Sequence, residues 1–306
     1  MNAMQAIRMT PDPPSSPADV ERRLKTVPFV ITAVANSDRG VTGAKKLSIL
    51  LTDDQEPLDV KWKEAPPGGD AWNNSPRREI GVYEVQKLFL DAEDYIIPTV
   101  VVRGVEFDVY RSVSETPSTN IAGTQCVYGA LAVWLHDAVQ PEHVFDRELF
   151  SRNHRYAYHF GNLNLLHYLT EHRDARASNF LMCTDPLNPK VFSIDNGIAF
   201  GRTVYNFFTW HFDKIRVDRL PRRSIDRLRQ LTRADLDRLA VLAELHADAG
   251  GVLRSVPSGL NLDSHEGNRI RPGIVQIGLT TTEIDDIAIR IQQLLGRIDR
   301  GELSVL

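Results

Sequence analysis

Residues 170–202 constrain the fold of this 306-residue chain most, because acidic and amide side chains stand at fixed distances around short apolar runs. Asp174 is followed five residues later by Asn179, and Asp195 comes sixteen residues after Asn179. Between Asn179 and Asp195 lie two apolar runs, separated by a loop that contains Asp, Asn and two Pro residues. This pattern predicts a β-hairpin whose loop is longer than two residues.

The hairpin predicts a place for a cation. If its loop is symmetric about Leu187, Asn179 lies opposite Asp195 at the end of the adjacent strand. An amide and a carboxylate at adjacent strand ends can share a hard cation through their oxygen atoms. Gly197 then allows a sharp backbone turn after the second ligand. The alternative is structural, since Asp and Asn beside a hairpin often serve as turn caps.

The order of these residues follows the signature of kinases. A His-Arg-Asp tripeptide ends at Asp174, Asn179 stands at the expected offset, and an Asp-Asn-Gly tripeptide begins at Asp195. In phosphoryl transfer, Asp174 would orient the attacking hydroxyl and accept its proton, while Asn179 and Asp195 would hold Mg²⁺ on the phosphates of ATP. A His-Arg-Asp tripeptide alone carries little weight, but the whole combination predicts a functional site that uses ATP and Mg²⁺.

Such a site also requires a lysine on a strand. Residues 46–64 predict two strands around an Asp-Asp-Gln-Glu-Pro turn, and the second strand places Lys61 and Lys63 on one face. Lys61 is the expected phosphate-binding residue, because it follows an apolar-x-apolar pattern, and Lys63 is the alternative. Without a function, the segment would be an edge strand with a solvated lysine face.

The partner of that lysine is expected to be Glu79. Ser75 and Pro76 predict the start of a helix, and Glu79 lies on the stripe that continues through Val82 and Phe89. Because burying an unpaired charge is costly, we expect Glu79 to bind Lys61. The structural alternative is that Glu79 only complements the positive start of the helix.

Two upstream glycines are candidates for contacts with phosphate. Gly40 and Gly43 can bring backbone N–H groups to the phosphates, or they can form a plain hairpin turn. The full G-x-G-x-x-G pattern of a glycine-rich loop is not present here.

Three stretches carry a resemblance to known proteins: RREIGVYEVQKLFLDAEDYIIPTVVVRG, NLNLLHYLTEHRDARASNFLM and FSIDNGIAFG. They resemble the atypical kinase-like families, which include the secreted Golgi casein kinases related to four-jointed, the type II phosphatidylinositol 4-kinases and the HipA-type kinases. Val60-Lys61-Trp62-Lys63 is similar to the Phe-Lys-Pro-Lys of the lipid kinases, whose first lysine holds ATP. The resemblance covers about residues 40–205 and identifies the superfamily better than the substrate.

The resemblance implies an α+β, two-lobed protein-kinase-like fold with a small β-rich N-lobe containing one helix and a larger, mainly helical C-lobe. We expect a disordered arm over residues 1–25, the N-lobe over 26–128 and the C-lobe over 129–306. The last strand of the N-lobe and the hinge are expected at 124–128. The helices of the C-lobe are expected to begin with 131–138, and the last is expected to be capped by Thr281 or Thr282.

Composition limits the partners and the location. A net charge of −4 gives no electrostatic case for nucleic acid, and no apolar run approaches the roughly twenty residues of a membrane span. The chain has only Cys126 and Cys183 and lacks an apolar secretory signal, so we expect reduced thiols in the cytoplasm. The secreted casein kinases, in contrast, are rich in disulfides, and no Ala-Pro-Glu segment follows Asp195.

The acceptor of the phosphoryl group is the least constrained prediction. A protein hydroxyl is favoured over an inositol lipid or a small molecule, because the sequence carries no basic membrane-binding surface. The alternatives are a nucleotide-binding pseudokinase that acts as a scaffold, a lipid kinase, and an enzyme that transfers AMP on the same fold.

Overall fold

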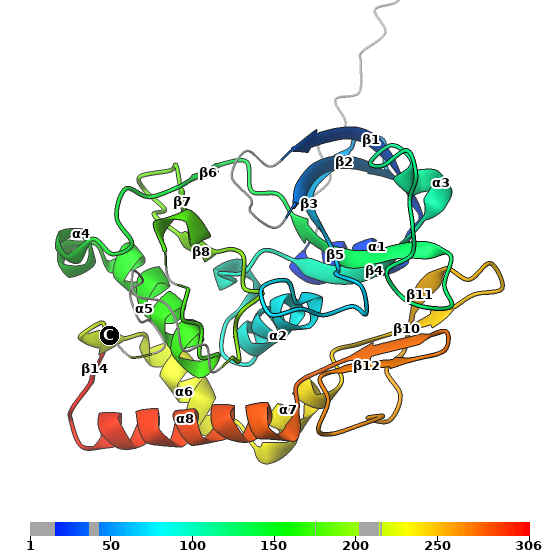
Figure 1. Cartoon of the computed structure of the whole chain (residues 1–306). Helices are drawn as coiled ribbons and strands as arrows, with labels where there is room; N and C mark the ends of the chain where they lie inside the picture. Colours follow the sequence, from blue (N-terminus) through cyan, green and yellow to red (C-terminus); the bar gives the residue numbers. More distant parts are fainter. Residues whose placement is uncertain (1–15, 37–42, 175, 202–213, 215) are drawn as a thin grey trace, which may run out of the picture.

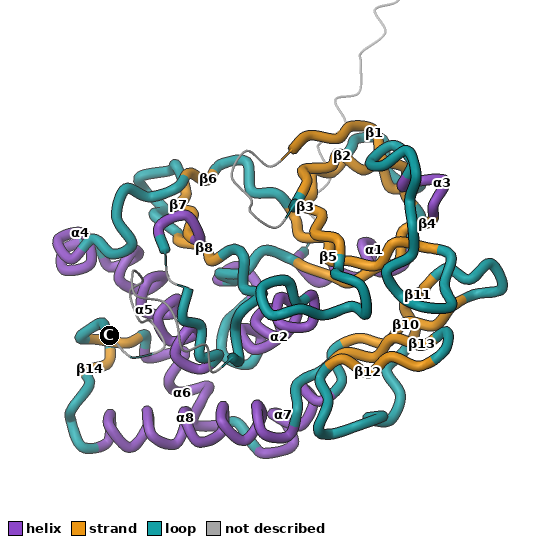
Figure 2. Tube along the Cα trace, viewed as in Figure 1, coloured by secondary structure: helices purple, strands orange, loops and turns teal. Residues whose placement is uncertain are grey.

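The computed structural model of the chain describes residues 16–36, 43–174, 176–201, 214 and 216–306. Its fold belongs to the α+β class, as the sequence predicted. A curled sheet lies beside a group of helices, and a second, smaller sheet lies below the first (Figures 1 and 2). Among the described residues, no helix combines the length and the apolar character needed to cross a bilayer.

The first sheet has five antiparallel strands in the spatial order β1-β2-β3-β5-β4. Alternate residues of β2 and β3 are buried, and side chains such as Trp62 belong to a hydrophobic core that the strands of this sheet share. The strands are β1 (Phe29–Asn36), β2 (Lys45–Leu51), β3 (Leu58–Glu64), β4 (Val100–Glu106) and β5 (Cys126–Val133).

Two helices pack against this sheet. Helix α2 (Pro76–Lys87) begins where the sequence predicted, with the Ser75 side chain accepting a hydrogen bond from the Arg78 N–H and with Pro76 in its first turn. Helix α1 (Pro17–Thr26) is capped by Ser16 and buries Leu24 completely in the core of the sheet. The predicted disordered arm is therefore wrong from residue 17 onward, and its first fifteen residues lie outside the described part of the chain.

The end of the first sheet also differs from the prediction. Strand β5 continues to Val133, so the predicted helix over 131–138 is wrong and the predicted boundary at residue 128 falls inside a strand. The first six residues of β5 are all buried, because the strand is covered on both faces. A strand buried on both faces lacks the alternating pattern that separates a strand from a helix in sequence. The connection that follows the sheet is formed by residues 134–137.

The helical part is built around α5 (His154–Leu169), which is buried along most of its length and contacts α2 and α8. Helix α8 (Thr281–Asp299) is capped by Thr280, one residue before the predicted cap, through a capping box with Glu283. The other helices are α3 (Phe107–Tyr110), α4 (Arg147–Arg152), α6 (Arg222–Gln230) and α7 (Arg233–Asp237), with short 3₁₀ helices η1 (Ala92–Asp94), η2 (Ala177–Asn179) and η3 (Arg238–Ala240).

Three small sheets complete the fold. The largest has the order β11-β10-β13-β12 and contacts β4 and α1. It lies within residues 129–306, which were expected to be mainly helical, and its strand β10 buries Ala243 and Leu245. Its strands are β10 (Ala243–Ala247), β11 (Leu253–Val256), β12 (Asn268–Arg271) and β13 (Ile274–Ile277). The second small sheet consists of β6 (Ala138–Val139), β7 (Phe180–Cys183) and β8 (Val191–Ser193). The third is the pair of β9 (Arg219–Leu220) and β14 (Ser304–Val305).

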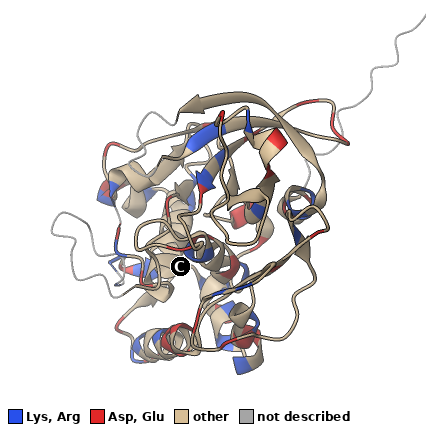
Figure 3. Cartoon of the chain, turned by 45° about the vertical axis from the view of Figure 1, so that its right-hand side comes forward, with Lys and Arg blue, Asp and Glu red and all other residues tan. Residues whose placement is uncertain are grey.

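Charged residues of both signs are interspersed along the ribbon (Figure 3). Many of them pair at the surface, as where Arg233 binds Asp237 at 2.7 Å and Asp285 at 2.5 Å. Exposed pairs of this kind contribute little to stability, about 0–1 kcal/mol each.

Candidate functional site

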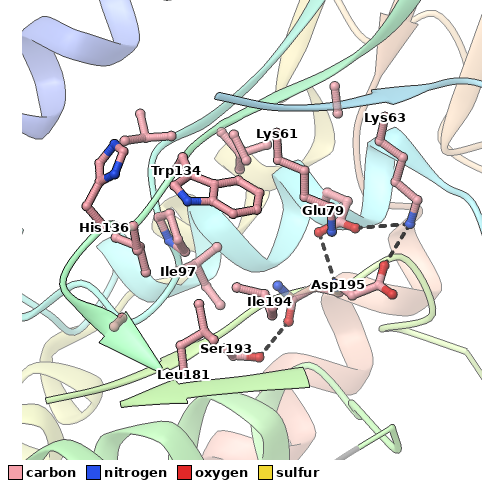
Figure 4. A pocket seen from close by; sticks show the side chains of 18 residues that line it. Lys61, Lys63, Glu79, Ile97, Trp134, His136, Leu181, Ser193, Ile194 and Asp195 are labelled. Carbon is pink, nitrogen blue, oxygen red and sulfur yellow. Dashed lines mark hydrogen bonds and ion pairs between the residues drawn. The ribbon is translucent and has the colours of Figure 1, made fainter. Parts of the chain in front are cut away.

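A cavity of about 280 Å³ lies between the first sheet, the connection 134–137 and the β7–β8 hairpin. Its two sides differ in chemistry, as Figure 4 shows: Trp134 and His136 lie at one side, and Lys63, Glu79 and Asp195 lie at the other. Small and aliphatic side chains line the space between them, among them Val100, Ala130, Ala132, Leu181 and Ile194. The cavity therefore offers an apolar slot that ends in a charged cluster, which is the usual composition of a small-molecule site.

The charged cluster is built around Lys63. Its Nζ lies 2.8 Å from Oδ1 of Asp195 and 3.5 Å from Oε1 of Glu79. The three residues come from β3, from the β8 end of the hairpin and from α2, so the cluster joins three parts of the fold (Figure 4). The predicted residues Glu79 and Asp195 are thus brought together by a common lysine.

The predicted pairing of Glu79 with Lys61 is wrong, because the lysine that binds Glu79 is Lys63. Both lysines point from the same face of β3, as the sequence indicated, and both line the cavity. Lys63 is opposite Ala130 of β5 and only 3% of its side chain is exposed. Lys61 is opposite Ala132, nearer the connection, and it forms no ion pair among the described residues. The two lysines are therefore two residues apart on the same face of β3, and Lys63 is the one that is buried and held by ion pairs.

Burial and charge act in opposite directions on this cluster. Burial lowers the pKa of Lys63, but the charges of Glu79 and Asp195 outweigh it, so the pKa of the Lys63 ammonium lies above its usual value. Burial raises the pKa of Asp195, and the positive charges of Lys63 and Lys61 outweigh that effect, so its pKa lies below its usual value. The Lys63 ammonium and the Asp195 carboxylate therefore both stay charged at neutral pH.

The backbone of Asp195 has a conformation that a non-glycine residue seldom adopts, with φ at +61°. The predicted sharp turn thus occurs at Asp195 itself, while no left-handed conformation is found at Gly197. Gly197 instead lies close to the ion pair: a Cβ there would lie 3.3 Å from Nζ of Lys63 and 3.5 Å from Oε1 of Glu79. Asp195 and Gly197 together let the chain pass closely around the ion pair.

The register of the hairpin differs by one residue from the prediction. Phe180 pairs with Ser193, and the Asn179 carbonyl accepts a hydrogen bond from the Ile194 N–H at 2.9 Å. Asn179 therefore lies opposite Ile194, and Asp195 follows directly after it. The reason is that the strand pairing continues to a hydrogen bond from the Cys183 N–H to the Lys190 carbonyl. The loop then consists of the six residues 184–189, so the hairpin is not symmetric about Leu187.

Asp174 and Asn179 form a second cluster next to the hairpin. The Asn179 side-chain amide donates 2.9 Å hydrogen bonds to both the carboxylate Oδ2 and the backbone carbonyl of Asp174. Arg176 binds the same carboxylate with two nitrogens, through Nε to Oδ1 at 2.6 Å and through a terminal nitrogen to Oδ2 at 2.7 Å. Asp174 is 6% exposed, whereas the Arg176 side chain is 55% exposed. Arg176 was missed in the sequence, although its place two residues after Asp174 was a usable signal.

The remaining predicted residues are the upstream glycines. Gly40 lies outside the described residues. Gly43 precedes β2 with φ at +69°, and a Cβ there would meet no atom within 4 Å. The left-handed backbone accounts for this glycine, and its predicted contact with phosphate stays a prediction.

A divalent cation would find two oxygen donors here, the Asn179 amide oxygen and the Asp195 carboxylate. Mg²⁺ is usually held by one or two protein ligands together with phosphate oxygens and water, so this donor set fits a metal that arrives with a nucleotide. Within the described ranges, no group of three or more His, Cys, Asp or Glu side chains gathers to hold a metal by itself.

Comparisons with known proteins add no family to this description: no protein-family model matches the chain, and no match was found among curated proteins.

Proposed function

We propose that this chain is an atypical kinase with a two-lobed, protein-kinase-like fold, which transfers the γ-phosphoryl group of ATP to a hydroxyl group with the help of Mg²⁺. The observation that carries the proposal is Lys63, held at 2.8 Å from Asp195 and 3.5 Å from Glu79 at the charged end of the cavity. A strand lysine held by a helix glutamate, beside a metal-binding aspartate, is the arrangement that kinases require.

In the proposed complex, the adenine ring lies in the apolar slot beside the connection 134–137, and the phosphates extend to the charged end of the cavity. Lys63 contacts the phosphates while Glu79 keeps its ammonium in place. Lys61 faces the same cavity and supplies a second positive charge, so both lysines named from the sequence act on the nucleotide.

Asn179 and Asp195 would hold Mg²⁺, which when bound neutralises the phosphate oxygens. Asp174 orients the acceptor hydroxyl and takes its proton as the oxygen–phosphorus bond forms. The bond between the γ-phosphorus and the bridging oxygen breaks, and ADP leaves with that electron pair. Arg176 is largely exposed, so it can turn from Asp174 toward the transferred group and balance its charge.

We expect the acceptor to be a protein hydroxyl, and the test leaves room for the alternatives. The purified chain is incubated with Mg²⁺ and with ATP labelled at either the α- or the γ-phosphate, with casein, inositol lipid vesicles or no acceptor. Label transferred from the γ-phosphate supports a kinase, and label from the α-phosphate would replace the proposal with AMP transfer.

An Asp195→Asn variant is the matched control, because it keeps the size of the side chain and removes a metal-binding charge. Transfer should be lost in this variant. If neither label is transferred but ATP still raises the melting temperature of the wild type, the chain is a nucleotide-binding scaffold and the kinase proposal is wrong.

A further inference from the structure

A continuous network of buried polar groups runs along the wall of the cavity, from α5 through β8 to α2. His167 Nε2 lies 2.9 Å from the Ser193 hydroxyl, and that hydroxyl donates a 2.9 Å hydrogen bond to Oδ1 of Asn196. The Asn196 N–H donates a 2.9 Å hydrogen bond to Oε2 of Glu79, whose other oxygen binds Lys63. His167, Ser193 and Asn196 are each at most 1% exposed, so water cannot replace these partners.

The chemistry of these polar groups fixes which one donates and which one accepts in each hydrogen bond. The Ser193 hydroxyl has one proton, and it goes to the amide oxygen of Asn196. The hydroxyl must then accept the bond from His167, which requires the proton of that imidazole to be on Nε2. Burial lowers the pKa of His167 well below its usual value, so the ring stays neutral and can keep this tautomer.

His167 is itself in contact with the loop that carries Asp174. Its ring stacks on that of His172 at 4.4 Å with an interplanar angle of 14°, and both rings are fully buried. His172 Nδ1 accepts a 3.3 Å hydrogen bond from the backbone N–H of Asp174. The polar network therefore connects the loop of Asp174 with Glu79, two groups that come from distant parts of the sequence.

We infer that Asn196 is a positioning residue, which acts with Ser193 and His167 to hold Asp195 in its left-handed conformation and to fix the carboxylate of Glu79. Asn196 follows Asp195 directly, and its backbone and its side chain are anchored on opposite sides. A turn anchored on both sides directs the Asp195 carboxylate toward Lys63 and the metal position. The consequence for catalysis rests on the proposed function, whereas the coupling between Ser193 and Lys63 does not.

The first test needs neither ATP nor metal. Ser193→Ala breaks the network, and Ser224→Ala is its matched control: Ser224 is also fully buried and donates a 2.6 Å hydrogen bond to an asparagine, Asn162, away from the cavity. Each variant is combined with Lys63→Met, and melting temperatures are measured. Ser193→Ala and Lys63→Met together should lower the melting temperature by about 2 °C less than the sum of their separate effects, since coupled residues are not additive. Ser224→Ala should add to Lys63→Met without coupling.

The second test measures turnover. In Ser193→Ala, the Mg²⁺ concentration that gives half-maximal ATP turnover should rise about tenfold, the usual effect of losing a group that orients a metal ligand. In Ser224→Ala it should stay within about twofold of the wild-type value. If both serine variants shift the Mg²⁺ requirement equally, or if Ser193→Ala is additive with Lys63→Met, the inference is wrong. A wild-type protein without turnover would refute the kinase proposal, and the melting-temperature cycle would still decide whether Ser193 is coupled to Lys63 through Asn196 and Glu79.

Discussion

Replacing Lys63 by methionine tests the central cluster most directly. Methionine keeps the length and the apolar part of the side chain but removes the ammonium group that two carboxylates share. Among the described residues, Glu79 would then keep the Asn196 N–H as its one remaining hydrogen-bond donor, at its other oxygen. Its side chain is 11% exposed, so its negative charge would stay largely desolvated.

The size of the effect follows from these exposures. Removing one partner of a buried ion pair commonly costs about 3–5 kcal/mol of unfolding free energy. The Asp195 side chain is 35% exposed, so it can be rehydrated from the cavity, and we expect a smaller loss of about 2–4 kcal/mol. For a chain of this size, about 2 °C of melting temperature corresponds to 1 kcal/mol, which gives a decrease of about 4–8 °C.

Lys61→Met is the matched control, since Lys61 lies on the same face of the same strand. Because Lys61 forms no ion pair among the described residues, this change should alter the unfolding free energy by about 0.5 kcal/mol or less. Turnover at saturating ATP should fall about a hundredfold or more in Lys63→Met, and mainly the KM for ATP should rise in Lys61→Met. Melting is followed without nucleotide by differential scanning fluorimetry, and turnover by the release of ADP.

A third variant separates charge from packing. Glu79→Gln added to Lys63→Met should recover part of the lost stability, because a neutral amide does not need a cation. Equal melting temperatures for Lys63→Met and Lys61→Met, or a larger loss of turnover in Lys61→Met, would refute the assignment of Lys63.

Two further predictions concern Asp174 and His159. Asp174→Asn keeps the volume of the side chain but removes the proton acceptor, so turnover should fall about 10²- to 10⁴-fold while the affinity for ATP changes little; near-normal turnover would make Asp174 structural. Burial, together with the charge of Lys190, lowers the pKa of His159 to about 4, so the unfolded chain binds a proton at a higher pH than the folded chain does. Stability should therefore decrease as the pH falls from about 6.5 to about 4, by up to about 3 kcal/mol from this residue, and the decrease should be smaller in His159→Gln. Urea unfolding across that pH range measures it, and identical pH profiles for the two proteins would contradict it.

Local signals in the sequence were sufficient for several elements of the site. The start of α2 depends on Ser75 and Pro76, which act within one turn, and the structure has that helix where the sequence predicted it. The hairpin between Asn179 and Asp195 likewise depends on neighbouring apolar runs and turn residues. Glu79 could be identified because its place on the buried stripe of α2 demands a cation.

The choice between Lys61 and Lys63 could not be made in the same way. Strand alternation places both on one face, and the difference between them is set by which lysine comes within reach of Glu79 and Asp195, which is a tertiary property. The register of the hairpin could not be predicted either. It depends on the hydrogen bond between the Cys183 N–H and the Lys190 carbonyl, and this register places Ile194, not Asp195, opposite Asn179. A strand that is buried on both faces, such as β5, has no alternation of apolar and polar residues from which it could be predicted.

The position of Glu79 is set by more than its own ion pair, because α2 is held from both sides. At its C-terminal end, Glu21 of α1 binds Lys87 at 2.7 Å and accepts a 3.0 Å hydrogen bond from the Tyr83 hydroxyl. At its N-terminal end, Arg77 forms a two-pronged ion pair with Glu283 of α8, at 2.7 and 3.1 Å.

The middle of α2 is fixed by close packing. A Cβ at Gly81 would lie 2.8 Å from the ring of Phe200, so only glycine lets the segment after Asp195 approach the helix this closely. The two ends and the middle of α2 are thus anchored by α1, by α8 and by the chain that carries Asp195. Because these anchors involve no nucleotide, the energy that orients Glu79 toward Lys63 is supplied by folding, and a nucleotide that enters the cavity need not order the helix.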